Sequence, residues 1–319
     1  MRTTGPSNSA LARLQQLLVL VALVLAAGWA GWAWDRGPAW LGAGLAVVFF
    51  GHAAVLALEF VLVAMVHGHD PAPRAAPLAL LKAWWHETHV APRVFAWRQP
   101  FAWRRWPDTV GQDTDPALPC VVLVHGFVCN RGFWLPWMSV LRGRRQAYVS
   151  VNLEPVFGSI DDYIPLIESA VQDAERAGGP LPVLVCHSMG GLAARAWLAS
   201  ASGNPARVGR IITIGSPHHG TWLGHFSHVP NGRQMRPGNA WLQALQQRER
   251  AQRPEGTYAA FVCWYSSADN IVFPASTASL PGADNRFLPA TPHVGMAFKS
   301  VVMDGTLALC RPEKAGLRP

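Results

Sequence analysis

The 319-residue chain has few charged residues, and this scarcity limits the classes of protein to which it can belong. Asp, Glu, Lys and Arg together make up 14% of the chain, whereas hydrophobic residues make up 50%. Such a composition is apolar for a water-soluble enzyme, yet too polar for a chain built wholly of membrane spans. We therefore expect a membrane segment attached to a globular part.

A dense basic run is also lacking, although the formal net charge is +8 at pH 7. The basic residues are mostly Arg and are scattered, and no recognisable nucleic-acid module accompanies them, so nucleic acid is not an expected partner. Between residues 84 and 106 Arg alternates with Trp. This alternation is typical of a segment at an anionic membrane surface, and equally of a Trp-rich segment packed over one side of a domain.

Cysteine is sparse and forms no metal-binding pattern. The five cysteines include no CxxC pair and no His/Cys cluster with the spacing of metal ligands, so we expect no metal and no cofactor. Cys120, Cys186 and Cys263 lie in apolar runs, where a reduced thiol behaves as a small hydrophobe. The odd number of thiols favours a reducing compartment, with one disulfide left open.

Two long apolar stretches stand near the N-terminus. Residues 17–34 carry one uncharged run that is long enough to cross a hydrocarbon core of about 30 Å as a helix. A signal peptide is the alternative for this run, but a second apolar stretch, residues 39–66, follows immediately after a short turn. The sequence therefore predicts that residues 1–70 form two transmembrane helices joined as a hairpin.

The flanking charges predict the orientation of this hairpin. Arg2 and Arg13 precede the first span and several basic residues follow the second, which by the positive-inside rule places both ends in the cytoplasm. We therefore predict a two-span anchor in a plasma membrane, with the rest of the chain on the cytoplasmic side. Glu59 within the second span is costly in lipid, so we expect it to face the partner helix or the interface.

The rest of the chain divides into two further parts. Residues 71–118 are predicted to be a Trp/Arg-rich juxtamembrane linker, and residues 119–319 a globular domain. In that domain apolar, β-branched runs alternate with helical patterns, as expected for buried parallel strands in a doubly wound α/β fold. The five runs are residues 120–124, 147–151, 183–186, 211–214 and 260–265.

The motif His187-Ser188-Met189-Gly190-Gly191 lies between the third of these runs and a helical pattern. A serine on a tight strand-to-helix turn is the context in which a G-x-S-x-G-like match indicates a nucleophile. The crowded turn requires small residues two positions away on either side, which Gly190 satisfies and Cys186 satisfies in place of the usual glycine. The alternative is a Gly-rich turn that merely exposes a serine.

A serine hydroxyl needs a base to accept its proton and an acid to orient that base. In this arrangement the chain order is Ser, acid, His. Asp269 follows the fifth apolar run and His293 stands near the end of the domain, so we predict Ser188, Asp269 and His293 as the catalytic residues, with Asp284 as second choice for the acid. His218 and His219 precede Asp269 and are expected to shape the pocket rim.

Acyl transfer also needs donors for the developing oxyanion. Two backbone N–H groups have the right sequence context, that of Met189 directly after the serine and that of Phe127 at the end of the first strand. Gly126 allows the chain to turn so that the amide of Phe127 faces the pocket.

Taken together, these motifs resemble the bacterial triacylglycerol lipases and related esterases of the α/β-hydrolase superfamily. The resemblance covers roughly residues 119–310 and rests on Val124-His125-Gly126-Phe127, His187-Ser188-Met189-Gly190-Gly191, residues 213–221, Asp269 with Val272 and Pro274, and His293-Val294-Gly295. It implies an α/β-hydrolase catalytic domain over residues 119–319, ester hydrolysis through an acyl-enzyme, and a cap or lid around residues 222–253. Some relatives bind calcium, but no acidic cluster here matches such a site.

The sequence thus predicts a membrane-tethered serine hydrolase that cleaves carboxylic, lipid-like esters. Its partners would be an apolar ester substrate and the membrane. Two alternatives remain open: a lipid acyltransferase or deacylase using the same three residues, and a catalytically silent hydrolase fold serving as a membrane interaction module.

Overall fold

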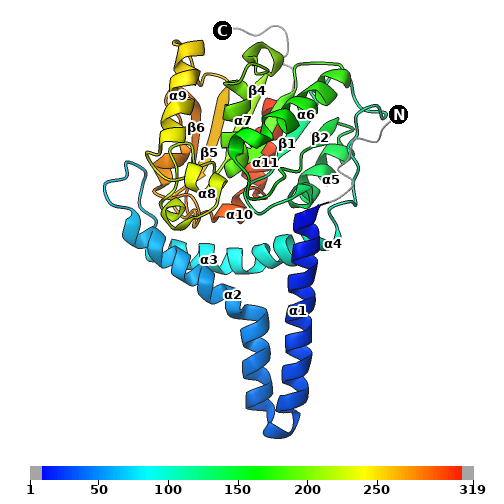
Figure 1. Cartoon of the computed structure of the whole chain (residues 1–319), viewed down its shortest axis with the longest axis vertical. Helices are drawn as coiled ribbons and strands as arrows, with labels where there is room; N and C mark the ends of the chain where they lie inside the picture. Colours follow the sequence, from blue (N-terminus) through cyan, green and yellow to red (C-terminus); the bar gives the residue numbers. More distant parts are fainter. Residues whose placement is uncertain (1–8, 311–319) are drawn as a thin grey trace.

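The computed structural model describes residues 9–310, and a six-stranded parallel sheet forms its centre (Figure 1). The strand order is β2-β1-β3-β4-β5-β6, and every neighbouring pair runs parallel. The strands are β1 (Val121–Val124), β2 (Tyr148–Ser150), β3 (Val183–His187), β4 (Arg210–Ile214), β5 (Phe261–Ser266) and β6 (Asp284–Leu288). The predicted doubly wound α/β fold is confirmed. The edge strand β6 is absent from the prediction because its residues are largely exposed and polar.

Side chains alternate between the two covered faces of the sheet. Val122 and Val124 of β1 pack into one apolar cluster, whereas Val121 and Leu123 pack into the other. The first cluster includes residues of α6 (Ile164–Arg176) and α7 (Met189–Leu198), and the second includes residues of α5 (Leu135–Gly143) and α11 (Ser300–Leu309). Because helices cover both faces, the central strands are mostly apolar, with polar residues such as Thr213 as exceptions.

The remaining elements of the domain are short, apart from α9. They are α8 (Pro230–Gln234), α9 (Ala240–Gln252), α10 (His293–Met296) and the 3-10 turns η3 (Arg131–Trp134), η4 (Ile160–Tyr163), η5 (Pro205–Arg207), η6 (Trp222–Phe226) and η7 (Ala275–Ala278). A helical segment begins directly after Ser159, because Ser159 and Asp162 form a reciprocal capping box.

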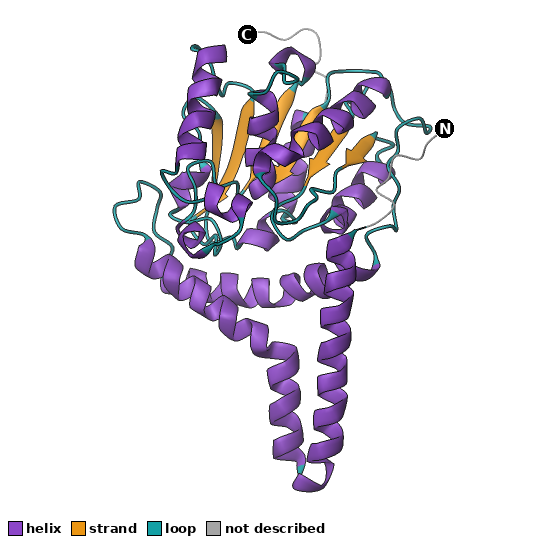
Figure 2. Cartoon of the chain, viewed as in Figure 1, coloured by secondary structure: helices purple, strands orange, loops and turns teal. Residues whose placement is uncertain are grey.

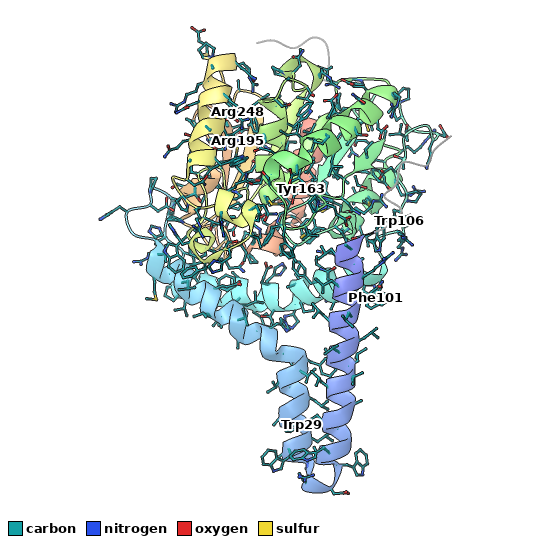
Figure 3. The ribbon with its side chains drawn as sticks, viewed as in Figure 1. Trp29, Phe101, Trp106, Tyr163, Arg195 and Arg248 are labelled. Carbon is teal, nitrogen blue, oxygen red and sulfur yellow. The ribbon has the colours of Figure 1, made fainter. Side chains whose placement is uncertain are left out.

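Two long helices project from the domain as a hairpin (Figure 2). They are α1 (Ala10–Ala33) and α2 (Pro38–Val66), joined by η1 (Trp34–Arg36), and both are long and apolar enough to cross a membrane. Large apolar side chains along them are exposed, among them Val24, Val47 and Met65. At the tip, Trp29 donates its indole N–H to the carbonyl of Trp40 at 2.9 Å (Figure 3).

The segment after the hairpin is helical where the sequence suggests a linker. It contains α3 (Pro77–Pro92), a π-helical stretch η2 (Arg93–Arg98) and α4 (Gln99–Phe101). In Figure 1, α3 runs between the hairpin and the sheet domain. Prolines allow this helix, because Pro77 occupies its first turn, where no N–H is needed, and Pro92 stands at its end.

The N-terminal end of α1 is docked on the globular part. Leu11 and Ala12 are buried, and the Gln15 amide donates to the side-chain oxygen of Gln99 at 3.0 Å. Gln16 donates to the carbonyl of Pro100 at 2.7 Å. The first helix is therefore held at the domain by its start, while Arg2, which the orientation argument used, lies outside the described residues.

Candidate active site

Ser188 occupies a strained turn between β3 and α7. Its φ is 54° and its ψ is −129°, a left-handed conformation that side chains other than glycine rarely adopt. Its backbone N–H still donates to the carbonyl of Ile214 at 2.9 Å, so β4 holds the turn in place. Such strain persists only where the surroundings over-determine the backbone, as they do here.

The neighbouring small residues are required by close packing. A Cβ atom on Gly190 would lie 2.5 Å from the carbonyl oxygen of Val124, and one on Gly191 would lie 2.2 Å from the Ser216 hydroxyl. Cys186, which replaces the usual glycine of the motif, is fully buried in the sheet core. A thiol side chain therefore fits at that position without opening the turn.

The loop after β1 lies directly against the serine. A Cβ atom on Gly126 would be 2.7 Å from the Cβ of Ser188 and 3.3 Å from its Oγ. Phe127 follows on this loop and, like Ser188, lines a common pocket, while Met189 is the first residue of α7. The two backbone N–H groups predicted as oxyanion donors thus belong to the two segments that meet at Ser188.

A buried histidine fixes this loop. His125 Nδ1 donates to the carbonyl of Gly126 at 2.9 Å, and His125 Nε2 accepts the backbone N–H of Leu153 at 3.0 Å. Both bonds require the neutral imidazole, with its proton on Nδ1. Burial lowers the pKa of His125 to about 4, which keeps the ring neutral near pH 7.

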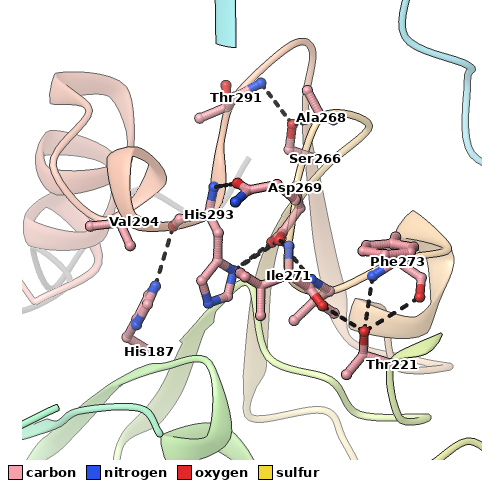
Figure 4. Close-up of polar contacts among 12 residues, drawn as sticks. His187, Thr221, Ser266, Ala268, Asp269, Ile271, Phe273, Thr291, His293 and Val294 are labelled. Atoms are coloured by element: carbon pink, nitrogen blue, oxygen red, sulfur yellow. Dashed lines mark hydrogen bonds and ion pairs between the residues drawn. The ribbon is translucent and has the colours of Figure 1, made fainter. Parts of the chain in front are cut away.

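Asp269 and His293 meet at the carboxyl end of β5 (Figure 4). His293 Nδ1 lies 2.9 Å from both carboxylate oxygens of Asp269. Oδ1 of Asp269 also accepts the backbone N–H groups of Ile271 at 2.9 Å and Val272 at 2.7 Å. Because Nδ1 is engaged by the carboxylate, only Nε2 of His293 is left to act on another group.

The charges around His293 favour its protonated form. Burial by itself lowers the pKa of His293, but the Asp269 carboxylate raises it through its charge and hydrogen bond. The carboxylates of Glu87 and Glu59 add to this effect, so that the pKa of His293 lies above 6.5. This is the electrostatic setting of a base that can hold a proton during a reaction.

Side-chain hydroxyls hold the two loops that carry this pair (Figure 4). The Thr221 hydroxyl donates to the carbonyl of Ile271 at 2.5 Å, and the Ser266 hydroxyl accepts the backbone N–H of Thr291 at 2.9 Å. Each hydroxyl ties a loop that bears a predicted catalytic residue to a neighbouring segment.

His187 is buried beside this pair. Its Nε2 donates to the backbone carbonyl of His293 at 3.3 Å, and its ring stacks on Phe133 with centroids 4.4 Å apart (Figure 4). Burial and the neighbouring His293 lower the pKa of His187 well below 6.5. A neutral His187 therefore supports the backbone of the loop that carries His293.

Ser188 and His293 line one pocket of about 390 Å³. The N-terminal helices form part of its wall: Val55, Leu56 and Glu59 come from α2, and Glu87 and Ala91 come from α3. Glu59 does not face the partner helix, one of the two positions expected for it, and the other, near the membrane interface, stays a prediction. Its Oε2 accepts the side-chain N–H of Asn270 at 2.6 Å, because α2 turns this face toward the carboxyl ends of the strands.

Glu87 is a second acidic group that the sequence reading did not identify. It is buried, and its carboxylate accepts the backbone N–H groups of Val294 at 2.7 Å and Gly295 at 3.0 Å. Burial raises the pKa of Glu87 to about 7. The signal that could have revealed it is a single acid in a segment otherwise rich in Trp and Arg.

Three other candidates lie elsewhere. Asp284, the second choice for the acid, forms an ion pair with Arg286 on the exposed edge strand β6. His218 and His219 do not line the Ser188 pocket. His218 is instead buried against Thr213, with Nε2 3.0 Å from its hydroxyl, because the turn after β4 folds it back onto the sheet.

The segment predicted as a cap does not contribute to the wall of the Ser188 pocket. Within residues 222–253, α9 packs on α7, where Glu249 pairs with the fully buried Arg195. The cap function of this segment stays a prediction. All five cysteines are buried and unpaired, and residues 9–310 contain no group of three or more His, Cys, Asp or Glu side chains able to hold a metal ion.

Comparisons with known proteins agree with this arrangement. The model of the Alpha/beta hydrolase family matches residues 121–307, more than half of the chain. The chain belongs to the alpha/beta hydrolase family. No curated protein matches it.

Solved structures of the same architecture include two lipases. Lipase BlEst2 of Bacillus licheniformis, in its mature form, is 17% identical with a TM-score of 0.54, over 62% of this chain and 94% of that chain. Lipase B of Aspergillus fumigatus is 17% identical with a TM-score of 0.51, over 89% of this chain and 75% of that chain. At these identities the likeness concerns the fold of the alpha/beta hydrolase domain.

Proposed function

We propose that this alpha/beta hydrolase is a membrane-tethered serine hydrolase that cleaves carboxylic, lipid-like esters with Ser188, His293 and Asp269. One structural observation is the main support for this proposal. His293 is held through Nδ1 by Asp269 at 2.9 Å, in the same pocket as a serine kept on a strained strand-to-helix turn. Family membership and the lipase neighbours support the same reaction class.

In the proposed reaction, Ser188 Oγ attacks the ester carbonyl carbon while His293 Nε2 accepts its proton. The Asp269 carboxylate stabilises the imidazolium that forms. The backbone N–H groups of Phe127 and Met189 bind the oxyanion, and each such donor contributes about 3 to 4 kcal/mol to the transition state. His293 then gives the proton to the leaving alcohol, and water releases the acid by the reverse sequence.

The pocket walls favour an apolar acyl chain. Val55, Leu56, Ala91 and Phe95 line the pocket on the side of the N-terminal helices, opposite the segments that carry the serine and histidine. A substrate with a hydrocarbon chain would exchange water for these side chains at about 25 cal/mol for each Å² of apolar surface buried. An ester of a small, charged acid would gain little from the same wall.

Membrane attachment is proposed from the exposed surface of the hairpin. Beyond its docked start, α1 continues from Leu17 to Ala33, about 26 Å of helix and close to the thickness of a hydrocarbon core, and large apolar side chains of both helices are exposed. The indoles of Trp29, Trp32 and Trp40 gather at the hairpin tip, where such rings prefer the interface between lipid and water. We propose the bacterial inner membrane as the site, with the domain on the cytoplasmic side.

The test uses the full-length protein in detergent and p-nitrophenyl esters of graded acyl length. Hydrolysis that Ser188→Ala abolishes, together with fluorophosphonate labelling of the wild type alone, is expected. Equal turnover by wild type and Ser188→Ala, or no turnover and no labelling in either, would refute the proposal and favour a silent interaction module. A lipid acyltransferase would instead be recognised by transfer of the acyl group to an added alcohol in preference to water.

A further inference from the structure

Glu59 is the only acidic residue in α2, and it contacts the loop of the hydrolase domain that follows β5. Its Oε2 accepts a hydrogen bond from Asn270 Nδ2 at 2.6 Å. Asn270 directly follows Asp269 in the chain and is almost fully buried. The hairpin therefore reaches the segment that carries the predicted acid through a direct side-chain hydrogen bond.

The other end of the Asn270 amide holds His293. Asn270 Oδ1 accepts the backbone N–H of His293 at 3.1 Å. With both ends engaged, the amide has one satisfactory orientation, because a flip would point its oxygen at the Glu59 carboxylate and its NH₂ group at the His293 N–H. Glu59 thus selects the amide orientation that His293 needs.

Two acids from the N-terminal helices together secure the start of α10. The N–H of His293 is held by Asn270, which Glu59 orients, and the next two N–H groups, those of Val294 and Gly295, are held by Glu87. In the described structure, the backbone that presents the imidazole therefore depends on α2 and α3 as well as on the sheet domain.

We propose that Glu59 is a positioning residue for His293, acting through Asn270, so that the membrane hairpin completes the active site of the hydrolase. This inference rests on the proposed function, since it assumes that His293 is the base. It links membrane attachment of the chain to its activity. A displacement of α2 that separates Glu59 from Asn270 would free the Asn270 side-chain amide to rotate, and the backbone N–H of His293 would then lose its fixed acceptor.

The experiment measures kcat and KM of full-length Glu59→Ala, Asn270→Ala and the double variant in detergent, with a p-nitrophenyl ester. A misplaced base lowers kcat about 10- to 100-fold while KM changes much less. Because Glu59 acts through Asn270, the double variant is expected to lose no more than Asn270→Ala alone. Glu59→Gln keeps an amide oxygen for Asn270 and is expected to restore most of kcat.

The pH profile gives a readout that a purely structural role would not move. The titratable groups facing His293 are Asp269, Glu87 and Glu59, together with the buried His187. Removing the charge of Glu59 in Glu59→Gln is expected to shift the acid limb of kcat/KM to lower pH. The matched control is Asp70→Asn: Asp70 also joins the hairpin side to the domain, by accepting the N–H of Ser276 at 3.1 Å, but lies outside the pocket.

The outcomes are distinct. Unchanged kcat and an unchanged acid limb in Glu59→Ala, or losses that add in the double variant, would overturn the role of Glu59 while leaving a Ser188-dependent hydrolase intact. Absence of Ser188-dependent turnover in the wild type would overturn the proposed function and this inference with it. If Glu59→Ala does not fold, the Asn270→Ala and Glu59→Gln variants test the proposal instead. A folded Asn270→Ala variant with wild-type kcat would also refute the positioning of His293 through Asn270.

Discussion

The carboxylate of Glu87 accepts the backbone N–H of Val294 at 2.7 Å, across 207 positions of the chain. A second oxygen of the same carboxylate accepts the N–H of Gly295 at 3.0 Å. α3 and the loop that carries His293 are thereby joined by a buried acceptor that satisfies two backbone donors. Buried N–H groups without an acceptor are costly, so this contact matters for stability as well as for the site.

Replacement of Glu87 by Ala is expected to destabilise the protein. Two buried N–H groups would lose their acceptor, at about 1 to 3 kcal/mol each. Thermal unfolding in detergent measures the effect. Glu154→Ala is the control, since Glu154 accepts only an exposed N–H, that of Ala10 at 3.2 Å, and should change stability little. Equal melting temperatures for Glu87→Ala and wild type would contradict the importance of the contact.

The same carboxyl group gives a pH dependence of stability. Burial raises the pKa of Glu87 from 4.5 to about 7, so the folded state binds its proton more tightly than the unfolded state. The contribution of this group is therefore fully present below pH 4.5 and is lost as the pH rises through about 7. The stability of wild type relative to Glu87→Gln is expected to fall across that window. A difference that stays constant or rises would show that the pKa of Glu87 is not raised.

Asp269→Asn is expected to lower kcat by about 10³- to 10⁴-fold, because the amide cannot stabilise the imidazolium of His293. Asp284→Asn should leave kcat almost unchanged, since Asp284 is paired with Arg286 on the exposed edge of the sheet. Steady-state kinetics on both variants distinguish the two acids. The reverse ranking would transfer the acid function to Asp284.

Much of the sheet domain could be predicted from the sequence, because the signals there are local. The strands β1 to β5 are mostly apolar runs, and the turn at Ser188 is indicated by the strand, the small residues and the helix that surround it. Asp269 and His293 were named as partners from chain order and context, and the structure places them 2.9 Å apart. The strands and the serine turn depend on residues close together in sequence, whereas the pairing of Asp269 with His293 follows from the order of the motifs along the chain.

The contribution of the N-terminal helices could not be predicted, because it depends on how distant segments pack. Glu59 contacts Asn270 over 211 positions, and a single acid in an apolar helix is equally compatible with several neighbours. The strand β6 begins with three polar residues, of which the first two are exposed, so it lacks the pattern of a buried strand. Alternation of Trp and Arg in the segment after the hairpin likewise did not distinguish a linker from the helix α3.

Gly215 is expected to be essential for activity. Its φ is +56°, and a Cβ atom there would lie 2.9 Å from Asp269 Oδ2 and 3.2 Å from His293 Nδ1. Gly215→Ala should therefore displace the acid and base and lower kcat about 10- to 100-fold. Gly282→Ala is the matched control, because Gly282 has a φ of +77° but no neighbour within 4 Å. It should lose about 1 kcal/mol of stability and no activity.

The buried pair of Arg195 and Glu249 is expected to dominate the attachment of α9 to α7. Both side chains are fully buried, and Arg195 donates to the two carboxylate oxygens at 2.9 and 2.7 Å. Glu249→Ala leaves the guanidinium uncompensated and should cost about 3 to 5 kcal/mol, whereas Arg195→Met with Glu249→Leu should cost less. Unfolding curves of the single and double variants test this. A single variant as stable as wild type would mean that water reaches the guanidinium.

The pH dependence of kcat/KM reports the base directly. His293 must be neutral to accept the serine proton, and Asp269 first, then Glu87 and Glu59, raise its pKa above 6.5 against the effect of burial. Activity is therefore expected to fall with a midpoint above 6.5 as the pH is lowered. Because the pKa of Glu87 is also raised to about 7, the measured midpoint reports the coupled titration of His293 and Glu87 and not that of His293 alone. Glu87→Gln removes one negative charge, so its midpoint should lie below that of the wild type. A wild-type midpoint below 6.5 would mean that burial outweighs the surrounding carboxylates.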